Sequence, residues 1–248
     1  MNETYVPEWE IPANVRALQT TRIGGVSHAP WNSFNLGDHV GDAPEAVAAN
    51  RALLRRKLPG DPFWLEQVHG TVAVDVDKWP KINQGDAAYS RQPGHVCAVM
   101  TADCLPVLFC DRQGSLVAAA HAGWRGLLAG VLESAVGAMQ VDPENILAWL
   151  GPAIGPAHFE VGSEVRDAFV AGDPAASLAF APRAADGKWL CDIYLLARQG
   201  LRRMGVTAIS GGDACTVSDG DRFFSYRRDG VTGRMASLIW LERAASGV

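Results

Sequence analysis

The sequence predicts a single-domain protein of the α+β class, and three observations support this. The chain has 248 residues, the upper edge of single-domain size, although two closely fused halves also fit that length. Hydrophobic residues make up 48% and charged residues 20%, so a sizeable core can form. Runs typical of strands and of helices are mixed along the chain without a linker, charge block or repeat, so we expect residues 1–248 to form one domain.

The first third of the chain predicts strands, a long loop and a helix. Residues 15–21 have the pattern of a strand and precede the loop RIGGVSHAPWNSFNLGDHVGD, whose length is typical of a functional segment. An acidic residue, a proline and a glutamate then indicate the start of a helix over residues 42–58. The runs at 63–68 and 71–76 predict two strands, which places the intervening His69 at a tight turn.

The middle of the chain predicts buried strands that lead into a helix. Short apolar runs at residues 95–101, 105–110 and 115–120 are separated by polar turns. Apolar residues then recur at helical spacing from Leu127 to Met139, so His121 is expected between a strand and a helix. The remaining predicted elements are strands at residues 146–150, 206–210 and 235–241, and helices near residues 163–170 and 194–204.

Charge and hydropathy exclude several classes of partner. The formal net charge of -5 gives no electrostatic reason to expect a nucleic acid. The acidic start MNETYVPEWEIPANV lacks the cationic and apolar stretches of a signal peptide, and the apolar runs are too short to cross a membrane. We therefore expect a cytoplasmic protein. The five cysteines are expected to be free thiols, with Cys97 and Cys110 as small buried hydrophobic residues.

Three residues that suit a transition metal, His69, Cys104 and His121, fall at the edges of predicted strands, where sites are commonly built. Their separations of 35 and 17 residues match no local metal motif, so spacing alone does not bring them together. Two histidines and a thiolate suit zinc and leave a fourth position open, as in catalytic sites. Asp103, next to Cys104, is a candidate to orient a ligand or carry a proton, and equally a turn residue.

Two other kinds of chemistry remain open for the same residues. Two histidines and a cysteine also form the equatorial ligand set of electron-transfer copper sites. Six histidines without a His-x-His pair, and one methionine near a candidate ligand, Met100 in a predicted buried strand, disfavour copper. Without a metal, Cys104 activated by His121 would be a cysteine nucleophile.

Arginines and aromatic residues supply further candidates. Guanidinium groups bind phosphate or carboxylate, and several arginines lie near glycines in loops. They are Arg22, Arg125, Arg227, Arg228 and Arg234. Aromatic rings either stack on a heterocycle or pack in the core, and core packing is expected for at least half of the candidates. They are Phe34, Phe223, Phe224 and Tyr226.

Taken together, the segments TTRIGGVS, FNLGDHVGD, WLEQVHG, TADCLPVLF, AAHAGWRG, LGPAIGP, FEVG and FFSYRRDGVTGRMAS resemble the YfiH or laccase-domain family, from about residue 21 to residue 237. The resemblance implies mixed β-sheets stacked as a sandwich with flanking helices, in α/β/β/α layers. It implies that zinc, or less favourably copper, is bound by His69, Cys104 and His121. We expect the substrate to contact residues within these segments: Arg22, Asn35, Gln67, Arg125 and Arg228.

The family resemblance also implies activities, namely purine nucleoside phosphorolysis, adenosine deamination and methylthioadenosine phosphorolysis, so a nucleoside and phosphate are the expected partners. In deamination, activated water would attack C6 of adenosine while Asp103 carries a proton. In phosphorolysis, Arg22 and Arg228 would hold phosphate against the anomeric carbon. Polyphenol oxidation, a Cys-His hydrolase reaction with Cys104 and His121 as catalytic residues, and a role as a peptidoglycan-editing factor remain alternatives.

Overall fold

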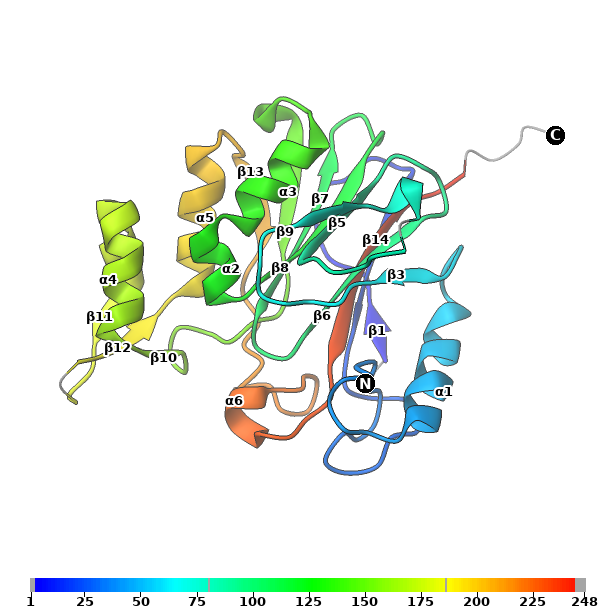
Figure 1. Ribbon diagram of the computed structural model, residues 1–248, viewed down its shortest axis with the longest axis horizontal. Coiled ribbons are helices and arrows are strands. Elements are labelled where there is room, and N and C mark those ends of the chain that lie inside the picture. The colour runs from blue at the N-terminus through cyan, green and yellow to red at the C-terminus, as the bar shows by residue number, and fades with distance from the viewer. Residues whose placement is uncertain (1–2, 80, 186, 244–248) are drawn as a thin grey trace.

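A computed structural model describes residues 3–79, 81–185 and 187–243 (Figure 1). Its strands form three sheets. The five-stranded sheet has the order β1 (Thr4–Tyr5), β2 (Val15–Thr20), β14 (Met235–Leu241), β6 (Val96–Thr101) and β3 (Pro62–Trp64). The six-stranded sheet has the order β13 (Ala208–Gly211), β9 (Ile146–Leu150), β7 (Leu105–Asp111), β8 (Val117–Ala122), β5 (Ala87–Ser90) and β4 (Ala73–Asp75). The small sheet contains β10 (Glu160–Gly162), β12 (Lys188–Cys191) and β11 (Phe180–Pro182).

Helices α1 (Pro44–Arg55), α2 (Trp124–Ala129), α3 (Val131–Met139) and α5 (Ile193–Arg203) cover the outer faces of the two large sheets (Figure 1). Helix α4 (Ser163–Gly172) lies beside the small sheet, and α6 (Tyr226–Asp229) lies in the loop before β14. Short 3-10 turns occur at Val76–Lys78, Pro143–Asn145 and Pro174–Ala179. One apolar cluster lies between the sheets, a second joins the six-stranded sheet to α2, α3 and α5, and a third joins the five-stranded sheet to α1. The predicted α+β class with α/β/β/α layers is confirmed.

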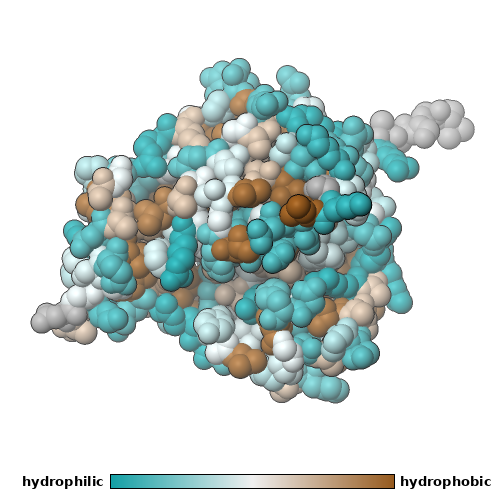
Figure 2. Space-filling view, viewed as in Figure 1, coloured by the Kyte–Doolittle hydropathy of each residue, from teal (hydrophilic) through white to brown (hydrophobic). Residues whose placement is uncertain are grey.

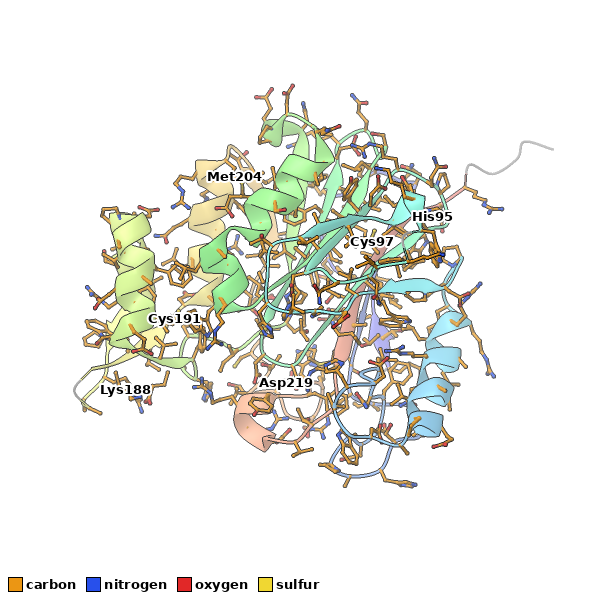
Figure 3. The ribbon with its side chains drawn as sticks, viewed as in Figure 1. His95, Cys97, Lys188, Cys191, Met204 and Asp219 are labelled. Atoms are coloured by element: carbon orange, nitrogen blue, oxygen red, sulfur yellow. The ribbon has the colours of Figure 1, made fainter. Side chains whose placement is uncertain are left out.

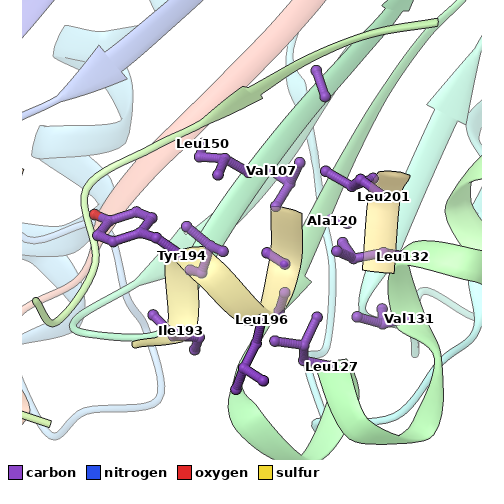
Figure 4. Close-up of a cluster of buried hydrophobic side chains, with 14 of the residues drawn as sticks. Val107, Ala120, Leu127, Val131, Leu132, Leu150, Ile193, Tyr194, Leu196 and Leu201 are labelled. Carbon is purple, nitrogen blue, oxygen red and sulfur yellow. The ribbon is translucent and has the colours of Figure 1, made fainter. Parts of the chain in front are cut away.

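Strand β7 shows how the sequence specifies two covered faces. All seven of its residues are buried. Val107 and Phe109 belong to the helix-side cluster, whereas Leu108 and Cys110 belong to the cluster between the sheets. Successive side chains of a strand point to opposite faces, so a continuous apolar run fits a strand covered on both sides. Figure 4 shows Val107 among the side chains of the helix-side cluster.

Two predicted strands and one predicted helix differ from the structure. The runs at 63–68 and 71–76 form shorter strands, β3 and β4, which belong to different sheets, so the chain between them crosses from one sheet to the other. The helix expected to continue to Met139 is divided into α2 and α3 at Gly130, whose φ of 99° is left-handed. Glycine adopts this conformation without steric cost, so it ends α2 although the apolar spacing continues.

The state of the cysteines is the one expected from the sequence, and the visible surface is of mixed polarity. All five cysteines are free, and Cys97 and Cys110 are buried as predicted; Figure 3 shows Cys97 among the strands. On the face seen in Figure 2, hydrophilic residues are interspersed with hydrophobic ones. In the described part of the chain, none of the helices is long and apolar enough to span a membrane.

Candidate metal centre

His69 lies in the segment that crosses between the two large sheets. Its φ of 60° is left-handed, which is uncommon for a residue with a side chain and is concentrated at functional sites. The buried carboxylate of Asp86 fixes this turn by accepting hydrogen bonds from the backbone N–H groups of Val68, His69 and Gly70, at 3.2, 2.9 and 2.7 Å. The predicted tight turn at His69 is therefore present, held by a side chain rather than by a strand pair.

Cys104 lies in a second crossing between the sheets, in the short loop between β6 and β7. The preceding Asp103 has a φ of 93°, and both oxygens of its carboxylate accept hydrogen bonds. Thr216 Oγ1 donates to one oxygen at 2.5 Å, and the backbone N–H of Arg227 donates to the other at 2.7 Å. Asp103 thus ties this loop to the segments around residues 216 and 227, and its proton-carrying role stays a prediction.

His121 lies inside β8, which ends at Ala122, two residues beyond the predicted strand end, and not between the strand and the helix as predicted. Its backbone N–H donates to the carbonyl of Asp86 at 2.7 Å, and its Nδ1 lies 2.8 Å from Asp86 Oδ1. An Nδ1–H donated to a carboxylate leaves Nε2 as the nitrogen with a free lone pair. One buried aspartate therefore orients both His121 and the turn that carries His69.

The ligand atoms of His69, Cys104 and His121 all lie within 4.8 Å of one another. Cys104 Sγ is 3.8 Å from His69 Nε2, and the centroids of the two imidazole rings are 4.8 Å apart with an interplanar angle of 75°. Burial raises the pKa of the Cys104 thiol, but the two histidines outweigh this effect and lower it below its ordinary value. A thiolate and two imidazole nitrogens, one backed by a carboxylate, form a donor set that fits zinc. Among the described residues, these three form the one group of this kind.

Gly123 provides the space that this cluster needs. A Cβ at this position would lie 2.8 Å from His69 Cδ2 and 2.9 Å from Cys104 Sγ, while its φ of -63° suits any residue. We expect Gly123→Ala to weaken metal binding at this cluster at least about tenfold, since small displacements of ligands are costly. Chelator competition measures this affinity. Gly137→Ala, in α3 with nothing within 4 Å of its Cβ position, is the matched control. Unchanged affinity in Gly123→Ala would contradict the proposed ligand positions.

Two cavities, each of about 320 Å³, meet at this cluster. His69, Cys104, Ala102 and Tyr226 line both. The first, which we call the aromatic cavity, is also lined by Asp103, Trp124, Arg125, Ile154, Phe159, Ile193 and Arg227. The second, which we call the polar cavity, is also lined by His39, Gln67, Met100, Thr101, His121 and Arg234. His69 and Cys104 therefore line both adjoining cavities, whereas His121 lines the polar cavity alone.

The structure brings two of the expected substrate-binding residues to these cavities. Arg125 lines the aromatic cavity, with its guanidinium 4.4 Å from the centroid of the Trp124 ring. Gln67 lines the polar cavity, and its amide pairs with the backbone N–H and carbonyl of Met100 at 2.7 and 2.8 Å. Their roles toward a substrate stay predictions.

The other three expected substrate-binding residues are engaged elsewhere and do not line either cavity. Arg22 donates to the carbonyls of Asn32 and Gly220. The Asn35 side chain bonds the backbone of residue 37, the carboxylate of residue 42 and the backbone N–H of residue 234. Arg228 pairs with Asp229 and donates to three backbone carbonyls. The structure shows scaffolding contacts for all three.

Sequence reasoning missed Asp86 and did not select Arg234 over the other arginines. Asp86 lies in QGDAAY, where no motif distinguishes it from a turn residue, and it is fully buried. Burial lowers the pKa of the Arg234 guanidinium, which faces the polar cavity. Of the aromatic candidates, Tyr226 lines both cavities and is exposed, while the three phenylalanines are buried.

Comparison with known proteins places the chain in a family. Residues 16–242 match the family described as multi-copper polyphenol oxidoreductase laccase. The purine nucleoside phosphorylase YfiH of Escherichia coli is 58% identical over 244 residues, which cover 97% of this chain and 100% of that relative. A purine nucleoside phosphorylase of Pseudomonas aeruginosa is 56% identical over 242 residues, which cover 98% of this chain and 100% of that relative.

Solved structures show the same fold. The crystal structure of Neisseria meningitidis protein NMB0706 superposes with a TM-score of 0.94 at 51% identity, covering 98% of this chain and 100% of that one. YlmD from Geobacillus stearothermophilus superposes with a TM-score of 0.85 at 32% identity, covering 93% of each chain. With the match over residues 16–242, these likenesses show that the chain belongs to the multi-copper polyphenol oxidoreductase laccase family, together with the YfiH-type purine nucleoside phosphorylases.

Proposed function

We propose that this protein is a zinc-dependent purine nucleoside phosphorylase that also deaminates adenosine and cleaves methylthioadenosine with phosphate. The observation that carries the proposal is the identity of 56–58%, over the full length, to relatives named purine nucleoside phosphorylases. Its partners would be a nucleoside and phosphate.

The aromatic cavity suits a purine. Trp124, Phe159 and Tyr226 provide ring surfaces, and Ile154 and Ile193 provide apolar walls. Aromatic faces stack on heterocycles, and small-molecule sites are commonly apolar with a few polar groups that fix orientation. A base in this cavity would lie beside His69 and Cys104, which line it.

Zinc held by His69, Cys104 and His121 would supply Lewis acidity, which activates water or polarises a substrate atom. The protein's own contribution is orientation. Asp86 holds His121 through Nδ1 and His69 through its backbone, so the His121 imidazole and the turn that carries His69 are fixed before substrate binds. Preorganised groups of this kind reduce the cost of reaching the transition state.

The two further activities place different demands on the same residues. Deamination needs a proton carrier near C6 of adenosine, and Asp103 lines the aromatic cavity while accepting two hydrogen bonds. Cleavage of methylthioadenosine needs space for an apolar 5′ substituent, which the walls formed by Ile154 and Ile193 favour.

The family description favours copper-dependent polyphenol oxidation as the second candidate. Multicopper chemistry needs a histidine-rich cluster in addition to one His₂Cys site. Within the described residues, His69, Cys104 and His121 form the one group of three or more potential ligands. This observation supports a single-metal enzyme over a multicopper oxidase.

Metal analysis of the purified protein, combined with product analysis, tests the proposal. The protein is incubated with inosine, adenosine or methylthioadenosine, each with and without phosphate. We expect stoichiometric zinc, release of the free base that depends on phosphate, and conversion of adenosine to inosine without phosphate.

Other results would support the alternatives. Stoichiometric copper with turnover of a phenol and no nucleoside product would establish the oxidase. A metal-free protein that is inactivated by alkylation of Cys104 would be a cysteine hydrolase. A peptidoglycan-editing factor would show neither nucleoside cleavage nor phenol oxidation, and its cellular role would be retained in His69→Ala.

A further inference from the structure

We propose that the polar cavity is the phosphate subsite, in which Arg234 and Thr101 bind the anion. This inference rests on the proposed phosphorolysis. It assigns phosphate, the second substrate of that reaction, to a cavity that the sequence did not predict. It also selects Arg234 among the candidate phosphate-binding arginines, because Arg234 lines this cavity whereas Arg22 and Arg228 do not.

Arg234 is held firmly, yet part of its guanidinium stays available. Its backbone N–H donates to Asn35 Oδ1 at 2.8 Å, and its NH1 donates to the carbonyls of Thr232 and Gly233, both at 3.1 Å. Its Cγ lies only 2.8 Å from where a Cβ on Gly37 would be, so the side chain packs closely on that backbone. Within the described part of the chain, Nε and NH2 of Arg234 donate to no protein acceptor, so these two nitrogens can donate to a ligand.

The charge of Arg234 lacks the compensation that other arginines have. Arg228 is paired with Asp229 at 2.7 Å, but within the described residues Arg234 has no carboxylate within 4.0 Å. No aspartate or glutamate is among the residues that line the polar cavity, whereas Asp103 lines the aromatic one. Cys104 and Asp103 stabilise the Arg234 charge through space but form no hydrogen bond or ion pair with it, so a bound anion would supply the direct partner that this partly buried cation lacks.

Thr101 gives independent evidence. It is the last residue of β6, lines the polar cavity and is only 2% exposed. Its Oγ1 is buried and has no hydrogen-bond partner among the described residues. A buried hydroxyl without a partner is destabilising, so a ligand that accepts its proton accounts for its presence.

The arrangement fits phosphorolysis. Phosphate in the polar cavity and the purine in the aromatic cavity would meet where His69 and Cys104 line both. A phosphate oxygen forms the bond to C1′ as the bond from C1′ to purine N9 breaks. The electron pair of that bond leaves with the purine, which takes up the proton of monohydrogen phosphate. The products are ribose 1-phosphate and the free base.

Kinetics with inosine test the assignment of Arg234. We expect Arg234→Gln to raise the KM for phosphate at least about tenfold while the KM for inosine changes less than about threefold, because the charge contacts phosphate alone. Arg234→Lys keeps the positive charge but loses the planar pair of N–H donors, so its KM for phosphate should lie between those of the wild type and Arg234→Gln. Arg202→Gln, an exposed charge removal in α5, is the matched control. A wild-type phosphate KM in Arg234→Gln would overturn the inference.

Thr101→Val separates binding from structure. Removal of an unpartnered buried hydroxyl should leave the melting temperature unchanged or higher. If Thr101 binds phosphate, the same variant should raise the KM for phosphate severalfold, and Thr101→Ser should restore it. A purely structural threonine would leave this KM unchanged, which would contradict its part in the subsite.

A binding measurement distinguishes failure of the subsite from failure of the proposed function. Inorganic phosphate alone should raise the melting temperature of the wild type and of Arg202→Gln, but not of Arg234→Gln. If this pattern appears and no nucleoside is cleaved, the subsite stands and the phosphorylase function is wrong. If nucleosides are cleaved and Arg234→Gln responds to phosphate like the wild type, the subsite is wrong and the function stands.

Discussion

Cys104→Ala is expected to reduce bound zinc from one per chain to nearly none and to lower phosphorolysis by more than about 100-fold. Loss of a group that merely supports a ligand typically costs 10–100-fold in metal affinity, and Cys104 is itself a candidate ligand. Two histidines alone would leave a weak, incomplete site. Elemental analysis and rates with saturating inosine measure both effects.

Cys215→Ala is the matched control for Cys104→Ala, because Cys215 is also partly buried but lines neither of the two cavities. It should retain zinc and activity. If Cys104→Ala keeps both, the assignment of the centre is wrong. If the wild type holds no metal and Cys104→Ala is inactive, the thiolate is a nucleophile and the zinc proposal fails.

Asp86→Ala is expected to have the largest effect on folding. It removes the acceptor for three backbone N–H groups and for His121 Nδ1, all at 2.7–3.2 Å. Loss of a buried carboxylate with several partners costs about 3–5 kcal/mol of unfolding free energy. Denaturant unfolding measures this loss.

Asp86→Asn should preserve the shape of the side chain and still weaken zinc binding about 10–100-fold, because an amide cannot accept from all four donors. Asp111→Asn is the matched control, since Asp111 is also buried and accepts hydrogen bonds from Ser115 and Leu116. It should lower stability without changing zinc affinity. A zinc affinity of Asp86→Asn equal to those of Asp111→Asn and the wild type would show that Asp86 does not orient the ligands.

The elements that sequence analysis located best are the strands covered on both faces. β9 and β14 begin and end where predicted, since an apolar run bounded by polar residues determines a buried strand. The small sheet of β10, β11 and β12 was not predicted, because strands of three or four residues carry little pattern. The break at Gly130 was also missed, since the apolar spacing continues through it.

The candidate ligands could be selected from their residue types and from the motifs that carry the family resemblance, but their meeting could not be derived from spacing. His69 and Cys104 come together because two segments cross between the same pair of sheets. Asp86 and Arg234 had no local signal, because their roles come from tertiary contacts with residues at least 16 positions away in the sequence. Supporting residues of a site are therefore the part that needs the structure.

Anomalous X-ray diffraction from crystals of the purified protein, recorded on both sides of the zinc absorption edge, tests the central claim most directly. We expect one zinc peak bonded to His69, Cys104 and His121, with each ligand at about 2.0–2.3 Å. A copper signal at that position, or zinc bound only elsewhere on the chain, would contradict the claim.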